Sequence, residues 1–166
     1  TTGLVLSRAI RFYDRGSGEI DRGQYDEVVS EPFGPCGCAA FYKRNALEKI
    51  SSTGDFFDPR FFFLVEDFDI AWRLRKAGFG CNYIPQAVCY HLRASSANKN
   101  TYRQYLSFRN RYFLIWKHLG LSYLWKGFPY SLTYDIPRAV YLFLCNGYVR
   151  RAFWCRLTNK RECAKR

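Results

Sequence analysis

The order of apolar and polar residues predicts short strands and turns at the start of the chain. Residues 3–13 are mostly apolar and indicate either a strand or an irregular segment. Residues 14–25 are rich in Gly, Asp and Ser and indicate a surface loop, which is either a plain connector or a lid beside a site. Residues 31–42 contain Gly34, Gly37 and a run of small side chains. They predict a tight turn into a buried strand, a wall that a ligand or a neighbouring backbone approaches closely, or both.

Helical periodicity appears in three further segments. Residues 43–50 predict a short helix. The clearest pattern begins near residue 66 and ends before Gly78, with basic residues in its last turn, as is typical of a helix C-terminus. A strongly basic pattern predicts a helix over residues 101–118. Residues 81–90 predict an extended segment that a proline interrupts, so it is not expected to be a regular central strand.

Aromatic residues gather before the helix at residue 66 and again in the last third of the chain. The first group is expected to form a core that excludes water from a nearby site. It consists of Phe56, Phe57, Phe61, Phe62 and Phe63. Residues 121–154 are aromatic and apolar with scattered Lys and Arg, broken at Pro129, and a helix is predicted over residues 137–154. Such a pattern is typical of a helix that lies in a membrane interface, and the alternative is a helix packed on another domain.

The charge is unevenly distributed along the chain. The 166 residues carry a formal net charge of +12, but residues 1–70 hold 8 Lys/Arg and 12 Asp/Glu, whereas residues 71–166 hold 18 and 2. A basic half suggests an anionic partner: phosphates, nucleic acid or an anionic membrane. The basic residues alternate with apolar ones and match no nucleic-acid-binding motif, so no nucleic acid partner is expected. No apolar run approaches the ~18 residues that a membrane-spanning helix needs.

Two features of the composition indicate how the chain arises and in which kind of cellular compartment it resides. The chain has no methionine, not even at position 1, so we expect a fragment of a longer reading frame or a processed chain. Its seven cysteines include no C-x-x-C pair, and the closest two are Cys36 and Cys38. This spacing fits neither a disulfide framework nor a common zinc pattern, so we expect buried, reduced thiols in a reducing compartment.

Three carboxylates at one helix start are the strongest candidates for chemistry. Glu66, Asp67 and Asp69 lie where the helix dipole stabilises negative charge, which favours ionised groups that act as a general base or hold a divalent cation. Side chains two positions apart on a helix diverge, so either Asp67 or Asp69 faces the site, and the other caps the helix or pairs with an arginine. The next extended segment ends at His91. The competing explanation is a capped, solvated helix start without a function.

Four segments then stand in a recognisable order over residues 31–118: FGPCGCAAFYKRNALEKI, GDFFDPRFFFLVEDFDIAWRLRKAGF, YIPQAVCYHLRASS and SFRNRYFLIWKH. With them the chain resembles the C-terminal half of family 2 glycosyltransferases with the GT-A fold, particularly rhamnosyltransferase-like enzymes of cell-surface polysaccharide assembly. The resemblance implies an α/β fold. Residues 1–118 would be the acceptor-side, C-terminal part of a GT-A (Rossmann-like) domain, and residues 119–166 a basic aromatic helical tail at a membrane interface.

The resemblance also implies roles for single residues. Asp67 matches the catalytic base, which takes the proton of the acceptor hydroxyl as that oxygen attacks the anomeric carbon, with inversion. Glu66 and Trp72 match residues of the acceptor site. Gly37 and Cys38 lie in the small-residue segment that lines the pocket for the donor sugar and the acceptor.

The phosphates and the metal ion of the reaction are expected on other residues. His91 matches the histidine that completes the coordination of Mg²⁺ or Mn²⁺ on the donor diphosphate. Arg109 and Arg111 would lie near phosphate, from the donor or from a lipid-linked acceptor. The implied partners are a nucleotide-sugar donor, a glycan or polyprenyl-diphosphate-linked acceptor, and a membrane surface bound by the tail.

The family's N-terminal half has no counterpart in the sequence. That half carries the nucleotide-binding βαβ units and the Asp-x-Asp metal motif, so the chain alone is expected to be inactive. The implied location is cytoplasmic and peripheral, at the inner face of the cell membrane. The alternative to a glycosyltransferase is a basic module that binds a membrane surface or a partner without catalysis.

Overall fold

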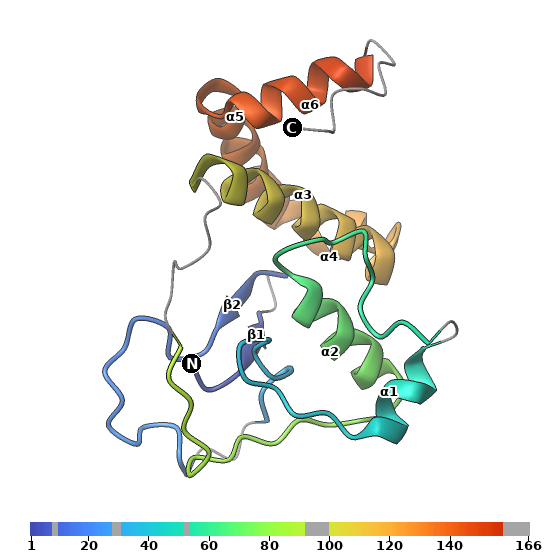
Figure 1. The fold of residues 1–166 in the computed structure, drawn as a ribbon. Helices are drawn as coiled ribbons and strands as arrows, with labels where there is room; N and C mark the ends of the chain where they lie inside the picture. Colours follow the sequence, from blue (N-terminus) through green and yellow to red (C-terminus); the bar gives the residue numbers. More distant parts are fainter. Residues whose placement is uncertain (8–9, 28–30, 52–53, 92–99, 158–166) are drawn as a thin grey trace. The chain divides into compact units, whose positions relative to one another are not determined.

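A computed structural model describes residues 1–7, 10–27, 31–51, 54–91 and 100–157. The chain divides into two compact units, Thr1–Ser95 and Ser96–Arg166, which are described separately below (Figure 1). The functional boundary after residue 118 that the family resemblance implies stays a prediction.

The apolar segment at the start of unit 1 folds back on itself as an antiparallel pair of strands. Strand β1 (Leu4–Leu6) pairs with β2 (Phe12–Asp14), and Leu4 lies opposite Asp14. An isolated bridge joins Leu4 to Gly34. This pair is the only sheet within the described residues, so the Rossmann-like part of the predicted fold stays a prediction.

The two helices predicted in unit 1 are present. Helix α1 spans Arg44–Ile50 and α2 spans Glu66–Lys76, and Gly78 adopts the left-handed conformation that ends many helices. On the face of α2 toward α1, Ile70 and Leu74 pack against Ala46 in a buried cluster. Figure 1 shows α2 beside both α1 and the strand pair.

The other face of α2 packs on the strands through aromatic rings. Phe68 lies 5.1 Å from Phe12 between ring centroids, and Trp72 lies 5.6 Å from Phe33. A Cβ atom at Gly34 would stand 2.3 Å from the Cβ of Ala71, so only glycine permits this close approach. The small-residue segment therefore serves close backbone packing, one of the two roles expected of it.

Two expectations for unit 1 are wrong in detail. Of the five phenylalanines expected in the core, only Phe61 is fully buried, whereas Phe62 is 74% and Phe57 50% exposed. Residues 35–43 form no strand; they are loop and turn up to the start of α1. The coil of residues 81–90 is not a strand either, as expected.

The thiols are also less buried than expected. Large apolar side chains fill the core, and the free cysteines lie on loops, on coil and on a helix surface. Among the described residues Cys36 and Cys81 are half-buried and Cys38, Cys89 and Cys145 are exposed. Cys155 forms a disulfide, so the expectation of uniformly buried, reduced thiols is wrong.

Unit 2 is helical throughout its described residues. Its elements are α3 (Asn100–Leu119), α4 (Ser122–Tyr130), the π-helical turn η1 (Ser131–Asp135), α5 (Ile136–Cys145) and α6 (Gly147–Leu157). The long basic helix is confirmed. Pro129 does not break the chain as expected, because it lies inside the last turn of α4 and a π-helical turn follows.

The helix predicted over residues 137–154 is divided at Asn146. Its side-chain Oδ1 accepts hydrogen bonds from the backbone N–H groups of Tyr148 (3.0 Å) and Val149 (3.3 Å), as an N-cap does. Its Nδ2 donates to the carbonyl of Thr101 in α3 at 2.7 Å. Asn146 therefore ends one helix, starts the next and ties both to α3.

The interior of unit 2 combines leucines with one buried ion pair. Leu106, Leu114 and Leu142 are buried, and Arg111 contacts Asp135 at 3.3 Å. Among the described residues, every helix is too short or too polar to span a bilayer.

Candidate functional site

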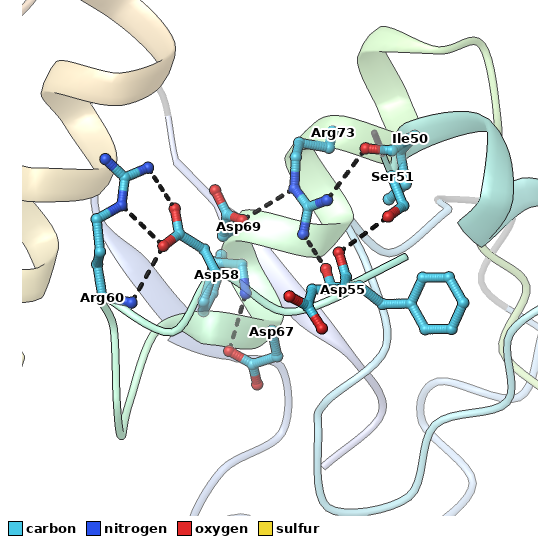
Figure 2. Close-up of polar contacts among 10 residues, drawn as sticks. Ile50, Ser51, Asp55, Asp58, Arg60, Asp67, Asp69 and Arg73 are labelled. Atoms are coloured by element: carbon cyan, nitrogen blue, oxygen red, sulfur yellow. Dashed lines mark hydrogen bonds and ion pairs between the residues drawn. The ribbon is translucent and has the colours of Figure 1, made fainter. Parts of the chain in front are cut away.

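Asp67 lies in the first turn of α2, and two backbone amides fix its carboxylate. Oδ2 accepts a hydrogen bond from the N–H of Gly37 at 3.1 Å. Oδ1 accepts one from the N–H of Phe68 at 2.9 Å, which Figure 2 draws as the dashed line to Asp67. The first bond joins α2 to the small-residue loop 30 positions earlier in the sequence. The loop thus holds the carboxylate in one orientation at the helix start.

The surroundings of Asp67 raise the pKa of its carboxyl group. Burial raises the pKa of this carboxyl above its ordinary value of 3.8, the hydrogen bonds from Gly37 and Phe68 oppose the shift, and the negative charge of Asp14 adds to it. A carboxylate with a raised pKa is a stronger base than one in solution, and this property suits a group that removes a proton.

Two polar atoms near Asp67 are buried without a hydrogen-bond partner in the described structure: Oε2 of Glu66 and the hydroxyl of Tyr42. Burial, and then the charge of Asp67, raises the pKa of the Tyr42 hydroxyl; burial also raises the pKa of Glu66. Unpaired buried polar groups are rare in proteins and concentrate where a ligand binds. Tyr42 also lines a cavity of unit 1. Nothing in the sequence indicates that its hydroxyl belongs to a site.

The backbone before the acidic residues adopts an uncommon conformation. Phe62, Leu64 and Val65 have φ angles of 61°, 69° and 74°, in the left-handed region that side chains other than glycine rarely adopt. For the β-branched Val65 this is a clear outlier, and it directly precedes Glu66. Strain of this kind persists where the surrounding structure imposes it, and it is typical of functional sites.

Of the two aspartates, Asp69 is the one that pairs with an arginine. It is fully buried, and its Oδ2 accepts a hydrogen bond from Nε of Arg73 at 2.9 Å (Figure 2). The same guanidinium donates to the carbonyls of Ile50 and Phe56. Asp69 is therefore structural: it positions an arginine that ties α2 to the segment after α1.

A cavity of about 900 Å³ opens in unit 1 beside this helix start. Its lining includes Cys36, Cys38, Tyr42, Tyr90 and His91. Asp67 lies next to this wall, because it binds the amide of Gly37 between the two cysteines. Cys38 and His91, which the sequence places at the site, thus share one cavity with Tyr42, and the aromatic lining suits the apolar faces of sugar rings.

The predicted metal ligand His91 is not accompanied by a full set of metal ligands within the described residues. His91 is exposed, and within the described residues no three His, Cys, Asp or Glu side chains converge as a metal site requires. One imidazole is too few to hold Mg²⁺ or Mn²⁺. The residues described here do not by themselves fit the ion that the resemblance implies.

The remaining predicted site residues lie in packed environments. Trp72 is buried among the rings of Phe12 and Phe33. In unit 2, Arg111 is 6% exposed and paired with Asp135. Arg109 is half-buried and donates to the side chain of Asn110 at 2.9 Å. Their expected contacts with acceptor or phosphate stay predictions.

Comparison with known proteins assigns the chain to a family. No curated protein and no solved structure gives a significant match. The model of glycosyl transferase family group 2, however, matches residues 21–157. This range covers most of the chain and contains Asp67, the Gly37 loop and the helices of unit 2 as far as α6. The chain therefore belongs to glycosyl transferase family group 2, as the motifs of its sequence predict.

Proposed function

We propose that this chain carries the acceptor side of an inverting glycosyltransferase and that Asp67 is its general base. Membership in the family implies a nucleotide-sugar donor and an acceptor. In the proposed step the acceptor oxygen forms a bond to the anomeric carbon, the bond from that carbon to the nucleoside diphosphate breaks, and the acceptor proton passes to Asp67. One displacement of this kind inverts the configuration at the anomeric carbon.

The hydrogen bond from Gly37 to Asp67 is the observation that best supports this role. It holds the carboxylate against a loop of small residues whose Cys36 and Cys38 line a large cavity, although Asp67 itself is not a lining residue. The raised pKa of Asp67 agrees with proton transfer to it. Glu66 beside it keeps a buried oxygen that has no hydrogen-bond partner among the described residues, which suits a group that binds an acceptor hydroxyl.

Several finer features of the proposal rest on the family resemblance. They are the GT-A, Rossmann-like architecture, a rhamnosyl or other hexosyl donor, a glycan or polyprenyl-diphosphate acceptor, and phosphate binding by Arg109 and Arg111. Mg²⁺ or Mn²⁺ stays a proposal that requires ligands besides His91, and the role of Asp67 does not depend on it. Transfer by residues 1–166 alone is not expected, since the nucleotide-binding half that carries the family's Asp-x-Asp metal motif has no counterpart in this sequence.

A membrane surface at the cytoplasmic face is the proposed place of action. The observation in its favour is a set of large apolar side chains exposed on the helices of unit 2 and on the turn between α3 and α4. The set includes Trp116, Leu121, Trp125, Tyr141, Leu144 and Trp154. Aromatic side chains among Lys and Arg bind the boundary between lipid headgroups and acyl chains. This proposal is independent of catalysis.

Asp67→Asn in the enzyme encoded by the complete reading frame tests the proposed base. The amide cannot accept the proton, so we expect kcat to fall by about 10²–10⁴-fold, while binding of the nucleotide sugar changes little. In the unsubstituted enzyme, activity should fall on acidification with an apparent pKa above 3.8. Asp21→Asn, in an exposed loop of the same unit, is the matched control. Near-normal turnover by a folded Asp67→Asn enzyme would exclude Asp67 as the base.

A further inference from the structure

Cys36 and Cys38 form a close pair of thiols at the candidate site. Their Sγ atoms are 3.7 Å apart, one residue separates them, and both line the cavity of unit 1. Cys38 is exposed and Cys36 half-buried, so small molecules in the cavity can reach both. The residue between them is Gly37, whose N–H holds Asp67.

The pair is close to the geometry of a disulfide. A disulfide needs its sulfur atoms about 2.05 Å apart and its Cα atoms about 4.4–6.8 Å apart. Two residues separated by one other span at most about 7 Å, so their Cα atoms lie near that range. Glycine between them leaves the backbone freer to adjust than any other residue would. A shift of about 1.7 Å in the S–S separation closes the bond.

We propose that Cys36 and Cys38 are a vicinal dithiol site that closes to a disulfide by exchange with a low-molecular-weight disulfide, such as glutathione disulfide. One protein thiolate attacks the disulfide, forms a mixed disulfide and releases one glutathione. The second protein thiolate then attacks the sulfur of its neighbour and releases the other glutathione. The protein loses two electrons and two protons, and the glutathione disulfide gains them.

The rate of this closure should depend strongly on pH. Loss of hydration and the adjoining Cys36 thiol raise the pKa of Cys38 to about 11. Because the thiolate is the attacking species, little of Cys38 reacts at neutral pH and the reaction accelerates as the solution becomes more alkaline.

Closure of the disulfide acts on Asp67 through Gly37. Drawing the two sulfur atoms together moves the peptide between them, and that peptide supplies one of the two amides on the carboxylate. Because this hydrogen bond lowers the pKa of Asp67, its loss should raise that pKa further. This second effect bears on sugar transfer only if Asp67 is the base, so it rests on the proposed function; the dithiol site does not.

The site is tested by mass spectrometry on the intact chain, incubated with glutathione disulfide at neutral and alkaline pH and then blocked with iodoacetamide. Trypsin releases the peptide of residues 23–43, whose only cysteines are Cys36 and Cys38. We expect this peptide to become lighter by two hydrogen atoms and to resist alkylation. Cys38→Ser should instead stop as a mixed disulfide, heavier by one glutathionyl group. Cys145→Ser, which removes an exposed thiol elsewhere, should behave like the unsubstituted chain.

Two outcomes overturn the dithiol site. One is a mixed disulfide that persists on the peptide of residues 23–43 in the unsubstituted chain; the other is two thiols that stay open to alkylation at every pH. The effect on Asp67 is tested separately by following the amide resonance of Gly37 as pH varies. It should track the titration of Asp67 in the reduced chain and cease to do so in the oxidised chain.

The proposed dithiol site and the proposed general base can each be rejected without the other. An active Asp67→Asn enzyme would reject the base and leave the mass result unchanged. An unreactive thiol pair would reject the dithiol and leave the base untouched.

Discussion

Gly37 and Asp67 are held together by a single hydrogen bond between a loop and a helix start. A Cβ atom at Gly37 would lie 3.4 Å from Cβ and 3.5 Å from Oδ2 of Asp67, which is ordinary contact distance. Gly37 does not adopt the left-handed conformation. Neither backbone strain nor a clash therefore requires glycine at this position. An alanine methyl group would occupy the space beside the Asp67 carboxylate.

Gly37→Ala should leave the stability of the fold nearly unchanged but hinder the approach of an acceptor to Asp67. We expect stability to change by less than about 1 kcal/mol, because alanine fits at this position, and sugar transfer to fall by about tenfold or more, because the methyl group covers the carboxylate. Steady-state kinetics with varied acceptor and thermal unfolding check the two parts. Gly147→Ala, where an added Cβ meets nothing within 4 Å, is the control. A fully active Gly37→Ala enzyme would mean that the acceptor does not approach along this side.

At the scale of elements, α2 carries Asp67 and is anchored by Arg73. Nε of this arginine donates to Asp69, and its terminal nitrogens donate to the carbonyls of Ile50 and Phe56. A lysine in its place could retain the charge, but its single nitrogen cannot reach the three acceptors that separate guanidinium nitrogens bind. Buried carbonyls left without a donor cost about 1–3 kcal/mol.

Arg73→Lys should therefore lower the free energy of unfolding by about 2 kcal/mol, measured by urea or thermal denaturation. Arg44→Lys is the matched control, since Arg44 also pairs with a carboxylate four residues along its helix, at 2.6 Å, but is exposed. There we expect a change within about 0.5 kcal/mol, as for other exposed ion pairs. Equal effects of the two substitutions would show that the buried network does not anchor α2.

Helix α2 also shows which features of the fold can be predicted from the sequence. Its start near Glu66 and its end before Gly78 follow from local signals, and both are confirmed. The choice between Asp67 and Asp69 depends on Gly37 and Ile50, which approach α2 only in the folded chain. No local pattern contains that information.

Errors in the predicted elements have the same origin. The apolar pattern of residues 137–154 is helical throughout, so it conceals the break that Asn146 makes by capping α6. Likewise, the hydrophobicity of Phe62 does not reveal that its side chain is exposed. The Tyr42 hydroxyl gives no signal in the sequence, since its burial without a partner among the described residues is a property of the folded site.

At the scale of the whole molecule, the net charge belongs to one unit. Residues 1–95 contain 12 Lys/Arg and 12 Asp/Glu, whereas residues 96–166 contain 14 and 2, so unit 2 alone carries the net +12. The exposed Trp and Leu side chains proposed to meet a membrane lie on the same unit. Each basic residue near an anionic membrane contributes about 1 kcal/mol of attraction, and this attraction is screened by salt.

Cosedimentation with lipid vesicles tests this assignment on the chain of residues 1–166. We expect binding to vesicles that contain phosphatidylglycerol, little binding to pure phosphatidylcholine, and a marked loss of affinity as salt rises from about 0.05 to 0.5 M. Trp125→Ala should weaken binding, because it removes an aromatic side chain that is 88% exposed on α4. Phe41→Ala, which removes an aromatic side chain of unit 1 that is 98% exposed, should not. If the two substitutions act alike, or if vesicle composition has no effect, the aromatic surface of unit 2 binds something other than an anionic membrane.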